Sequence, residues 1–310
     1  MPAAILFRLG TKPNPAGRVT PMNDNEITRT IEHVVSAIDS AAQHQDPFYH
    51  LQLADVFPSD LYSVMLNTMP VKQDYRPMSG RTKTTRTADG GGTRTKIDLF
   101  PEFIRHLPSG KQRAWAVAGR ALCSREVREA FRKRLAPGLE ERFGQAYQRV
   151  GMYPIPILTR DVPGYRIGIH PDTRWKGMTI QIYLPRDRSC EHVGTAFHKR
   201  TGETSYKKIR QMPFLPNTGY AFAVGKHTYH SVETVGPEVQ TRDSILLTYF
   251  VDSSVLHIMR NRGRRFGNFL LNECRYFKSG WGSSRRDDAQ SQLNLVTNAS
   301  APGPGGRSDK

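Results

Sequence analysis

Two short stretches of the sequence hold side chains that could bind a metal ion. In GYRIGIHPDTRWKGMTIQIYLP, residues 164–185, His170 and Asp172 lie two residues apart at the end of an alternating run. Side chains at i and i+2 of a strand share a face, so the imidazole and the carboxylate should project together. His230 heads a second such run, YHSVETV. On its own, a His and an Asp at a strand end are more often a surface hydrogen-bonded pair.

A third stretch, TRDSILLTYF, places Arg242 and Ser244 on one face of an expected strand. The planar guanidinium suits a carboxylate partner that it can bind through two hydrogen bonds. A simpler interpretation is an arginine at a strand edge, in an ion pair with Asp243 or Glu233.

The order of these motifs along the chain resembles that of the Fe(II)- and 2-oxoglutarate-dependent dioxygenases, over roughly residues 150 to 252. The motifs are His170-x-Asp172, then His230, then Arg242-x-Ser244. The resemblance implies a double-stranded β-helix of the prolyl-hydroxylase-like kind, with His170, Asp172 and His230 as iron ligands. MTIQIYLP looks like the strand that carries a cosubstrate-binding tyrosine in that group, and Tyr183 falls there.

The resemblance also implies the reaction. Two imidazoles and a carboxylate on one side of Fe(II) leave the opposite positions open. There 2-oxoglutarate and O2 would bind, and decarboxylation to succinate and CO2 would yield the oxidant that hydroxylates a substrate. Arg242, with Tyr183 and Ser244, would bind the distal carboxylate of 2-oxoglutarate. Mn, Co or Zn could occupy the same ligands.

Other residues remain candidates. His227 is a rival for the third ligand. It is three residues from His230, so on a regular strand the two side chains should point to opposite faces. His198 could touch substrate or make an ordinary loop-end hydrogen bond. Arg174, just past Asp172, could line the mouth of the site or lie in a solvated turn.

Helices and strands must position these residues, and the sequence divides accordingly. Residues 1–150 are expected to form a mainly helical support region, with helices at 23–43, around 59–70 and at 111–144, the last broken at Pro137 and Gly138. Residues 151–255 alternate in short strands between turns, as in a sandwich or barrel. The predicted fold class is therefore α+β. A basic extension, 256–286, and a disordered tail, 287–310, should follow.

The formal charge of +17 indicates anionic partners without identifying them, because a solvated basic surface would have the same composition. The basic, glycine-rich stretch 79–96 predicts a mobile loop, in which Arg81 and Arg86 could bind an anionic substrate. No nucleic-acid-binding motif supports a nucleic-acid partner. The short apolar run AAILF is too short to span a bilayer, so we expect a cytoplasmic protein. The three cysteines are expected to be reduced.

The substrate class stays open. The first hypothesis is hydroxylation of an anionic small molecule or of an anionic metabolite attached to a polymer. The second is hydroxylation of a protein side chain, and the third is demethylation of a nucleic acid. A different class of protein also fits the sequence: a non-catalytic, cupin-like metal-binding module with a basic surface for polyanions.

Overall fold

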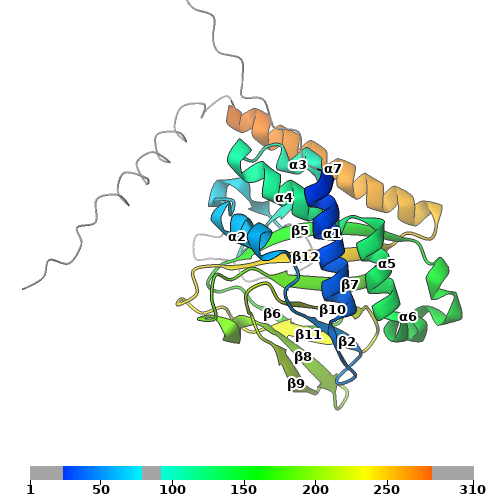
Figure 1. The fold of residues 1–310 in the computed structure, drawn as a ribbon. Helices are drawn as coiled ribbons and strands as arrows, with labels where there is room; N and C mark the ends of the chain where they lie inside the picture. The colour runs from blue at the N-terminus through cyan, green and yellow to red at the C-terminus, as the bar shows by residue number, and fades with distance from the viewer. Residues whose placement is uncertain (1–23, 79–91, 281–310) are drawn as a thin grey trace, which may run out of the picture.

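The computed structural model describes residues 24–78 and 92–280, and its centre is a pair of antiparallel sheets that enclose a shared core (Figure 1). The large sheet has eight strands in the order β1 (Ala42–His44), β2 (His50–Leu53), β10 (Gly219–Ala223), β7 (Lys176–Tyr183), β12 (Arg242–Val251), β5 (Met152–Asp161), β4 (Arg94–Asp98) and β3 (Arg76–Pro77). The small sheet has four strands in the order β6 (Ile167–His170), β11 (Tyr229–Val232), β8 (Thr195–Arg200) and β9 (Tyr206–Met212).

The path of the chain between the two sheets defines the fold. From β5 onward, strands β5, β7, β10 and β12 join the large sheet, whereas β6, β8, β9 and β11 join the small one. Eight antiparallel strands divided in this way between two facing sheets form a double-stranded β-helix, or jelly roll. The α+β fold class predicted from the sequence, with this core, is confirmed.

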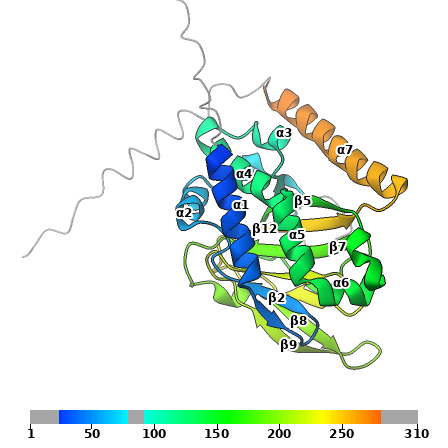
Figure 2. The ribbon, with the colours of Figure 1, turned by 45° about the vertical axis from the view of Figure 1, so that its right-hand side comes forward.

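Helices cover the outer face of the large sheet (Figures 1 and 2). They are α1 (Asp24–Asp39), α4 (Ser109–Leu122), α5 (Arg125–Arg134) and α6 (Ala136–Phe143). Ile180 of β7 and Leu247 of β12 share one buried cluster with Trp115 of α4 and Phe131 of α5. Because strand side chains alternate between faces, the other half of these strands points between the two sheets.

The remaining elements are short, except for the last helix. They are α2 (Ser59–Asn67), the single-turn helix α3 (Pro101–Ile104), the 3-10 helices η1 (Lys72–Asp74), η2 (Gly144–Arg149) and η3 (Glu191–Val193), and α7 (Val255–Gly280). Figure 2 shows α7 at the edge of the molecule, and its Phe269 packs on the cluster that holds Phe100 and Phe250. Within the described ranges no helix has the length and apolarity needed to cross a bilayer.

The predicted loop at 79–96 is wrong at its C-terminal end. Arg94 and Lys96 lie in β4, a paired strand of the large sheet, and both side chains are largely buried. Their charges are accommodated because carboxylates lie beside them, which composition alone does not reveal. Residues 79–91, including Arg81 and Arg86, lie outside the described residues.

The expected break near Pro137 and Gly138 is present but lies at Leu135, and a second break, at Cys123 and Ser124, was not predicted. Helix α4 ends at Leu122, α5 ends at Arg134, and Pro137 lies in the first turn of α6. Proline is tolerated there because the N–H groups of a helix's first turn have no partner within the helix.

Candidate metal centre

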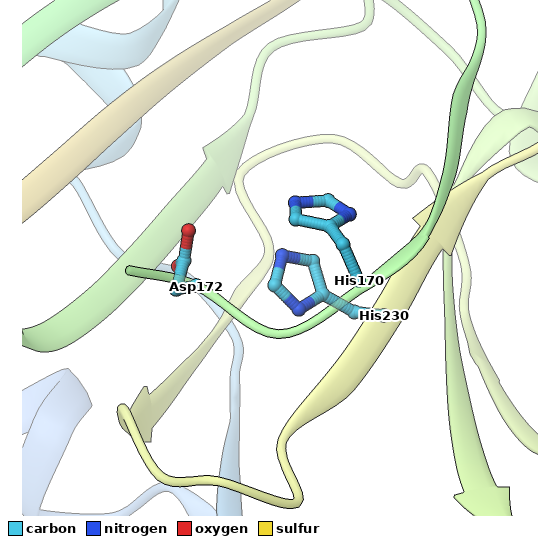
Figure 3. A group of neighbouring side chains, drawn as sticks. All are labelled: His170, Asp172 and His230. Atoms are coloured by element: carbon cyan, nitrogen blue, oxygen red, sulfur yellow. The ribbon is translucent and has the colours of Figure 1, made fainter. Parts of the chain in front are cut away.

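Two histidines of the small sheet lie side by side on one face of it. His170 ends β6 and His230 lies in β11, and the two residues are directly paired across these antiparallel strands. Their ring centroids are 4.5 Å apart (Figure 3). The β-ladder therefore brings together two imidazoles that are 60 residues apart in the sequence.

Asp172 completes a group of three possible ligands. It follows β6 by two residues, beyond Pro171, and its carboxylate lies beside the two rings (Figure 3). One ligand atom from each of His170, Asp172 and His230 lies within 4.8 Å of the others, and this is the one such group among the described residues. The structure thus brings together the three residues that the sequence selected.

Hydrogen bonds at Nδ1 set the orientation of both rings. His170 Nδ1 lies 2.8 Å from the carbonyl oxygen of Gly168, and His230 Nδ1 lies 3.0 Å from that of Thr228. A carbonyl can only accept, so each Nδ1 is the donor and each Nε2 keeps its lone pair for a metal. Burial lowers the pKa of His230 to about 4, so this ring is neutral at neutral pH.

The Asp172 carboxylate is held ionised by two neighbours. Lys176 Nζ donates to Oδ1 at 2.6 Å, and the Thr179 hydroxyl donates to Oδ2 at 2.7 Å. Burial alone would raise the pKa of Asp172, but the charge of Lys176, assisted by His230 and by these hydrogen bonds, outweighs it and lowers the pKa. The donor set is therefore the Nε2 atoms of two imidazoles and an anionic carboxylate, which fits Fe(II) in a facial triad.

His227 does not share this arrangement. It lies in the turn before β11 and is exposed, whereas His230 is buried beside Asp172. Of the two rivals, His230 is thus the one beside His170 and Asp172.

Arg242 is fully buried, and it is already in an ion pair. Its Nη1 donates to Oδ2 of Asp161 at 2.9 Å, its Nε to the carbonyl oxygen of Val193 at 2.6 Å, and its Nη2 to the Thr195 hydroxyl at 3.3 Å. The two ion-pair partners considered from the sequence are bound elsewhere: Asp243 to Arg160, and Glu233 to Lys208.

Arg94 shares the same carboxylate. Its Nε and Nη2 donate to the two oxygens of Asp161 at 2.5 and 2.7 Å. Arg242, Asp161 and Arg94 are directly opposite one another on β12, β5 and β4, so they form one row across the sheet. Two guanidinium groups and one carboxylate leave a net positive charge in the interior. The Arg94 guanidinium also lies 4.2 Å from the ring centre of Tyr165, whose buried hydroxyl has no hydrogen-bond partner.

Tyr183 belongs to this cluster, and Ser244 lies just beyond it. The Tyr183 hydroxyl donates to the Thr195 side chain at 2.9 Å, and its ring centre is 5.5 Å from the Arg242 guanidinium. Ser244 instead hydrogen-bonds Thr159 at 2.9 Å and accepts from Gln181 at 2.8 Å. Ser244 thus joins a separate polar chain within the barrel.

Tyr220 packs against both Tyr183 and Phe222, with its ring centre 6.0 Å from that of each, and the ring centre of Phe222 is 5.3 Å from that of His230. The Tyr220 hydroxyl donates to the Gln181 side chain at 2.7 Å. Burial raises its pKa, and the charges of both Arg242 and Asp172 act on the phenol in opposite directions. The sequence analysis did not select Tyr220, Arg94 or Asp161, although inward-facing polar residues at period two were the available signal.

The two remaining candidates are not brought to the metal ligands. His198 lies opposite Tyr229 on β11, so it occupies the other face of the small sheet from His230, and its Nε2 is 2.8 Å from the Ser231 hydroxyl. Arg174 is exposed in the turn before β7, with its guanidinium 5.5 Å from the ring centre of Trp175.

Comparison with known proteins gives matches in structure alone. No family model and no curated protein sequence matches the chain. A prolyl-4-hydroxylase from Pseudomonas putida is 15% identical, with a TM-score of 0.41 over 72% of this chain and 99% of that one. A Trichoplax adhaerens prolyl hydroxylase, solved with a peptide fragment of a hypoxia-inducible factor, is 13% identical, with a TM-score of 0.42 over 74% and 91%. An oxidoreductase of the 2OG-Fe(II) oxygenase family from Burkholderia pseudomallei is 14% identical, with a TM-score of 0.40 over 65% and 84%.

Proposed function

We propose that the protein is an Fe(II)- and 2-oxoglutarate-dependent oxygenase. The observation that carries this proposal is the convergence of His170, His230 and Asp172, with both Nε2 atoms left open by hydrogen bonds at Nδ1. When bound, Fe(II) with 2-oxoglutarate and O2 supplies oxidation of a substrate, with release of succinate and CO2. The chain supplies the ligands and their orientation, and two of the three ligands, His230 and the Asp172 carboxylate, are buried.

The positive row at Arg242 and Arg94 is the proposed site for the distal carboxylate of 2-oxoglutarate. Its two guanidinium groups share one carboxylate, Asp161, so a second carboxylate would balance the remaining charge. The unpartnered hydroxyl of Tyr165 is a donor that a bound carboxylate could accept from. Tyr183 contributes its ring beside Arg242, and Ser244 supports the strand without a free donor directed at this site.

The proposed substrate is an anionic small molecule or an anionic unit attached to a polymer, and the proposed oxidation is hydroxylation. The formal charge of +17 supports an anionic substrate, and Lys176 already lies beside the metal ligands. A protein side chain is the second choice. Arg174, at the turn after Asp172, remains a candidate for substrate contact, as do Arg81 and Arg86.

One observation favours a different function. Arg242 already has a buried countercharge in Asp161, so the row could be a purely structural ion pair. The protein would then be a non-catalytic, cupin-like metal-binding module whose basic surface binds polyanions. Such a module would bind polyanions in a salt-sensitive way, and would still bind them after His170 or Asp172 is replaced.

Anaerobic titration with Fe(II) and 2-oxoglutarate separates the two functions. Chelation of the iron by the cosubstrate gives a weak visible charge-transfer band, which the oxygenase should show. The band should vanish in His230→Ala and persist in His227→Ala, the matched control three residues away. Succinate release with candidate anionic substrates would then follow. Absence of the band in the unaltered protein, with metal still bound, would favour the non-catalytic module.

A further inference from the structure

Helix α7 leaves most of its large apolar side chains exposed, whereas Phe269 and several polar side chains contact the protein. Asn261 and Asn272 are buried, and Arg265 is partly buried in a bidentate pair with Glu102 of α3. The large apolar side chains are 42 to 79% exposed. They are Val255, Leu256, Ile258, Met259, Phe266, Leu270, Leu271 and Phe277. This is the reverse of a helix that contributes to a core.

Most of these exposed side chains form a continuous stripe. Leu256, Met259, Phe266, Leu270 and Phe277 are separated by three, four or seven residues, which places them on one side of an α-helix. Figure 2 shows α7 along the edge of the molecule, and no described element covers this side of it. An apolar surface of this kind marks an interaction site.

The charge of the helix indicates the chemistry of the partner. Between residues 255 and 280 the sequence has six basic side chains and a single acidic one, Glu273. Arg262 lies one helical turn from both Met259 and Phe266, so it borders the stripe. A second copy of α7 would bring a further set of positive charges to the same contact, which disfavours self-association through this face.

A basic cavity adjoins the helix. Its volume is about 920 Å³, and seven arginines line it against two acidic residues, Glu129 and Asp252. Arg262 and Arg265 line it from α7, where they pair with Asp252 and Glu102. Three further arginines are exposed and line it from α4, α5 and η2, namely Arg120, Arg125 and Arg149. Anionic groups next to the apolar stripe would therefore meet a concentrated positive field.

We propose that α7 binds the surface of an anionic phospholipid bilayer. The apolar stripe would enter the boundary between head groups and acyl chains, and the arginines of the cavity would bind lipid phosphates. Trp175, which is 43% exposed, lies beside α7, because the Arg260 guanidinium is 4.4 Å from its ring centre. Apolar contact and positive charge occur together here, as in helices that lie in a membrane interface. This inference does not depend on the proposed function.

Flotation of the full chain with vesicles tests the proposal. Binding is expected to vesicles of phosphatidylcholine mixed with phosphatidylglycerol, and much less to vesicles of phosphatidylcholine alone. Phe266→Ser should lower the partition coefficient about tenfold, since a buried aromatic side chain is lost from the interface. The matched control is Val64→Ser, an exposed apolar residue of α2. Arg149→Gln should lower binding to the anionic vesicles about fivefold.

Four results would overturn the proposal. The first is equal binding of the chain to both kinds of vesicle, and the second is equal vesicle binding by the Phe266→Ser and Val64→Ser variants. The third is a dimer that forms without lipid and that Phe266→Ser abolishes. The fourth is vesicle binding that is seen only after residues 1–23 are removed. The third would assign the stripe to a second copy of the chain, and the fourth to its own N-terminal segment. Thermal unfolding of each variant checks that it is folded, and because Phe266 is exposed, its replacement should leave the melting temperature unchanged.

Discussion

Arg242 and Asp161 form an ion pair in which both side chains are fully buried, with Nη1 and Oδ2 separated by 2.9 Å. Burial of an ion pair costs desolvation free energy, which is recovered only if the remaining hydrogen-bonding groups are satisfied. Here much of that cost is met: Arg242 also donates to Val193 and Thr195, and Asp161 also accepts from Arg94. These bonds and the one to Asp161 use three of the five N–H groups of the Arg242 guanidinium. The pair is thus one part of a three-residue row with an excess positive charge.

Replacement of Arg242 tests the role of this row in cosubstrate binding. In Arg242→Gln, Asp161 keeps two hydrogen bonds from Arg94, so no buried carboxylate is left unpaired. We expect the affinity for 2-oxoglutarate to fall about 10- to 100-fold, because one or two charged hydrogen bonds are lost. The affinity for Fe(II) should stay the same. Titration calorimetry under anaerobic conditions measures both, and equal loss of the two affinities would contradict the role.

Replacement of Asp161 should lower the stability of the protein, whereas replacement of Arg242 should lower its affinity for the cosubstrate. In Asp161→Asn, Arg94 and Arg242 lose their shared countercharge, so the free energy of unfolding should fall by about 3 to 5 kcal/mol. An added dicarboxylate could restore part of it by balancing the two cations. We therefore expect 2-oxoglutarate to raise the melting temperature of this variant more than that of the unaltered protein. Equal shifts in the two proteins would show that the row does not bind the cosubstrate.

The three residues of the candidate metal centre could be selected from the sequence because their pattern is local. His170 and Asp172 are two residues apart at a strand end, and His230 heads a strand of its own. Asp161 and Arg94 could not be found in this way. Each is a charged residue whose burial depends on a partner in another strand, and no local pattern specifies such a pairing.

Strands were predicted within residues 151–255 but not at β1 to β4, which lie in the region expected to be mainly helical and join the large sheet. Tertiary context also overrides local preference within the predicted strands. Strand β5 contains Pro154 and Pro156, which normally argue against a central strand. Strand β4 pairs with β5 only from Ile157 onward, and beyond it the Pro156 carbonyl accepts from the Leu99 N–H. The prolines are thus tolerated where no neighbouring strand requires their missing N–H. The outward apolar face of α7 was equally beyond prediction, since the sequence gives the stripe but not its direction.

Removal of the Thr179 hydroxyl tests how Asp172 is held. Thr179 donates to Oδ2 of Asp172 at 2.7 Å, which fixes the carboxylate relative to the two imidazoles. Loss of such a supporting hydrogen bond typically lowers metal affinity 10- to 100-fold, and for Thr179→Val we expect about tenfold weaker Fe(II) binding. Thr248→Val is the matched control, since Thr248 lies opposite Thr179 on β12 and is also buried. A metal affinity lowered equally by both replacements would mean that the effect is one of packing.

The pH dependence of stability should carry a contribution from His50 of β2. Burial lowers its pKa to about 4, and its Nε2 is buried without a hydrogen-bond partner. A histidine is protonated with a pKa of about 6.5 in the unfolded chain, so between about pH 6.5 and 4 the unfolded state binds more protons than the folded state. Stability due to His50 is therefore fully present above this window, and is lost as the pH falls through it, by up to about 3 kcal/mol.

The His50→Leu variant isolates that contribution. Leucine cannot be protonated, and it suits a position beside the rings of Phe48 and Phe197. Urea unfolding of the metal-free proteins at neutral pH and near pH 4 should show a smaller loss of stability in the variant than in the unaltered protein. The other buried histidines, His198 and His230, are present in both proteins, so their contributions cancel in the comparison. Parallel stability curves for the two proteins would mean that His50 takes up its proton as readily in the folded chain as in the unfolded one.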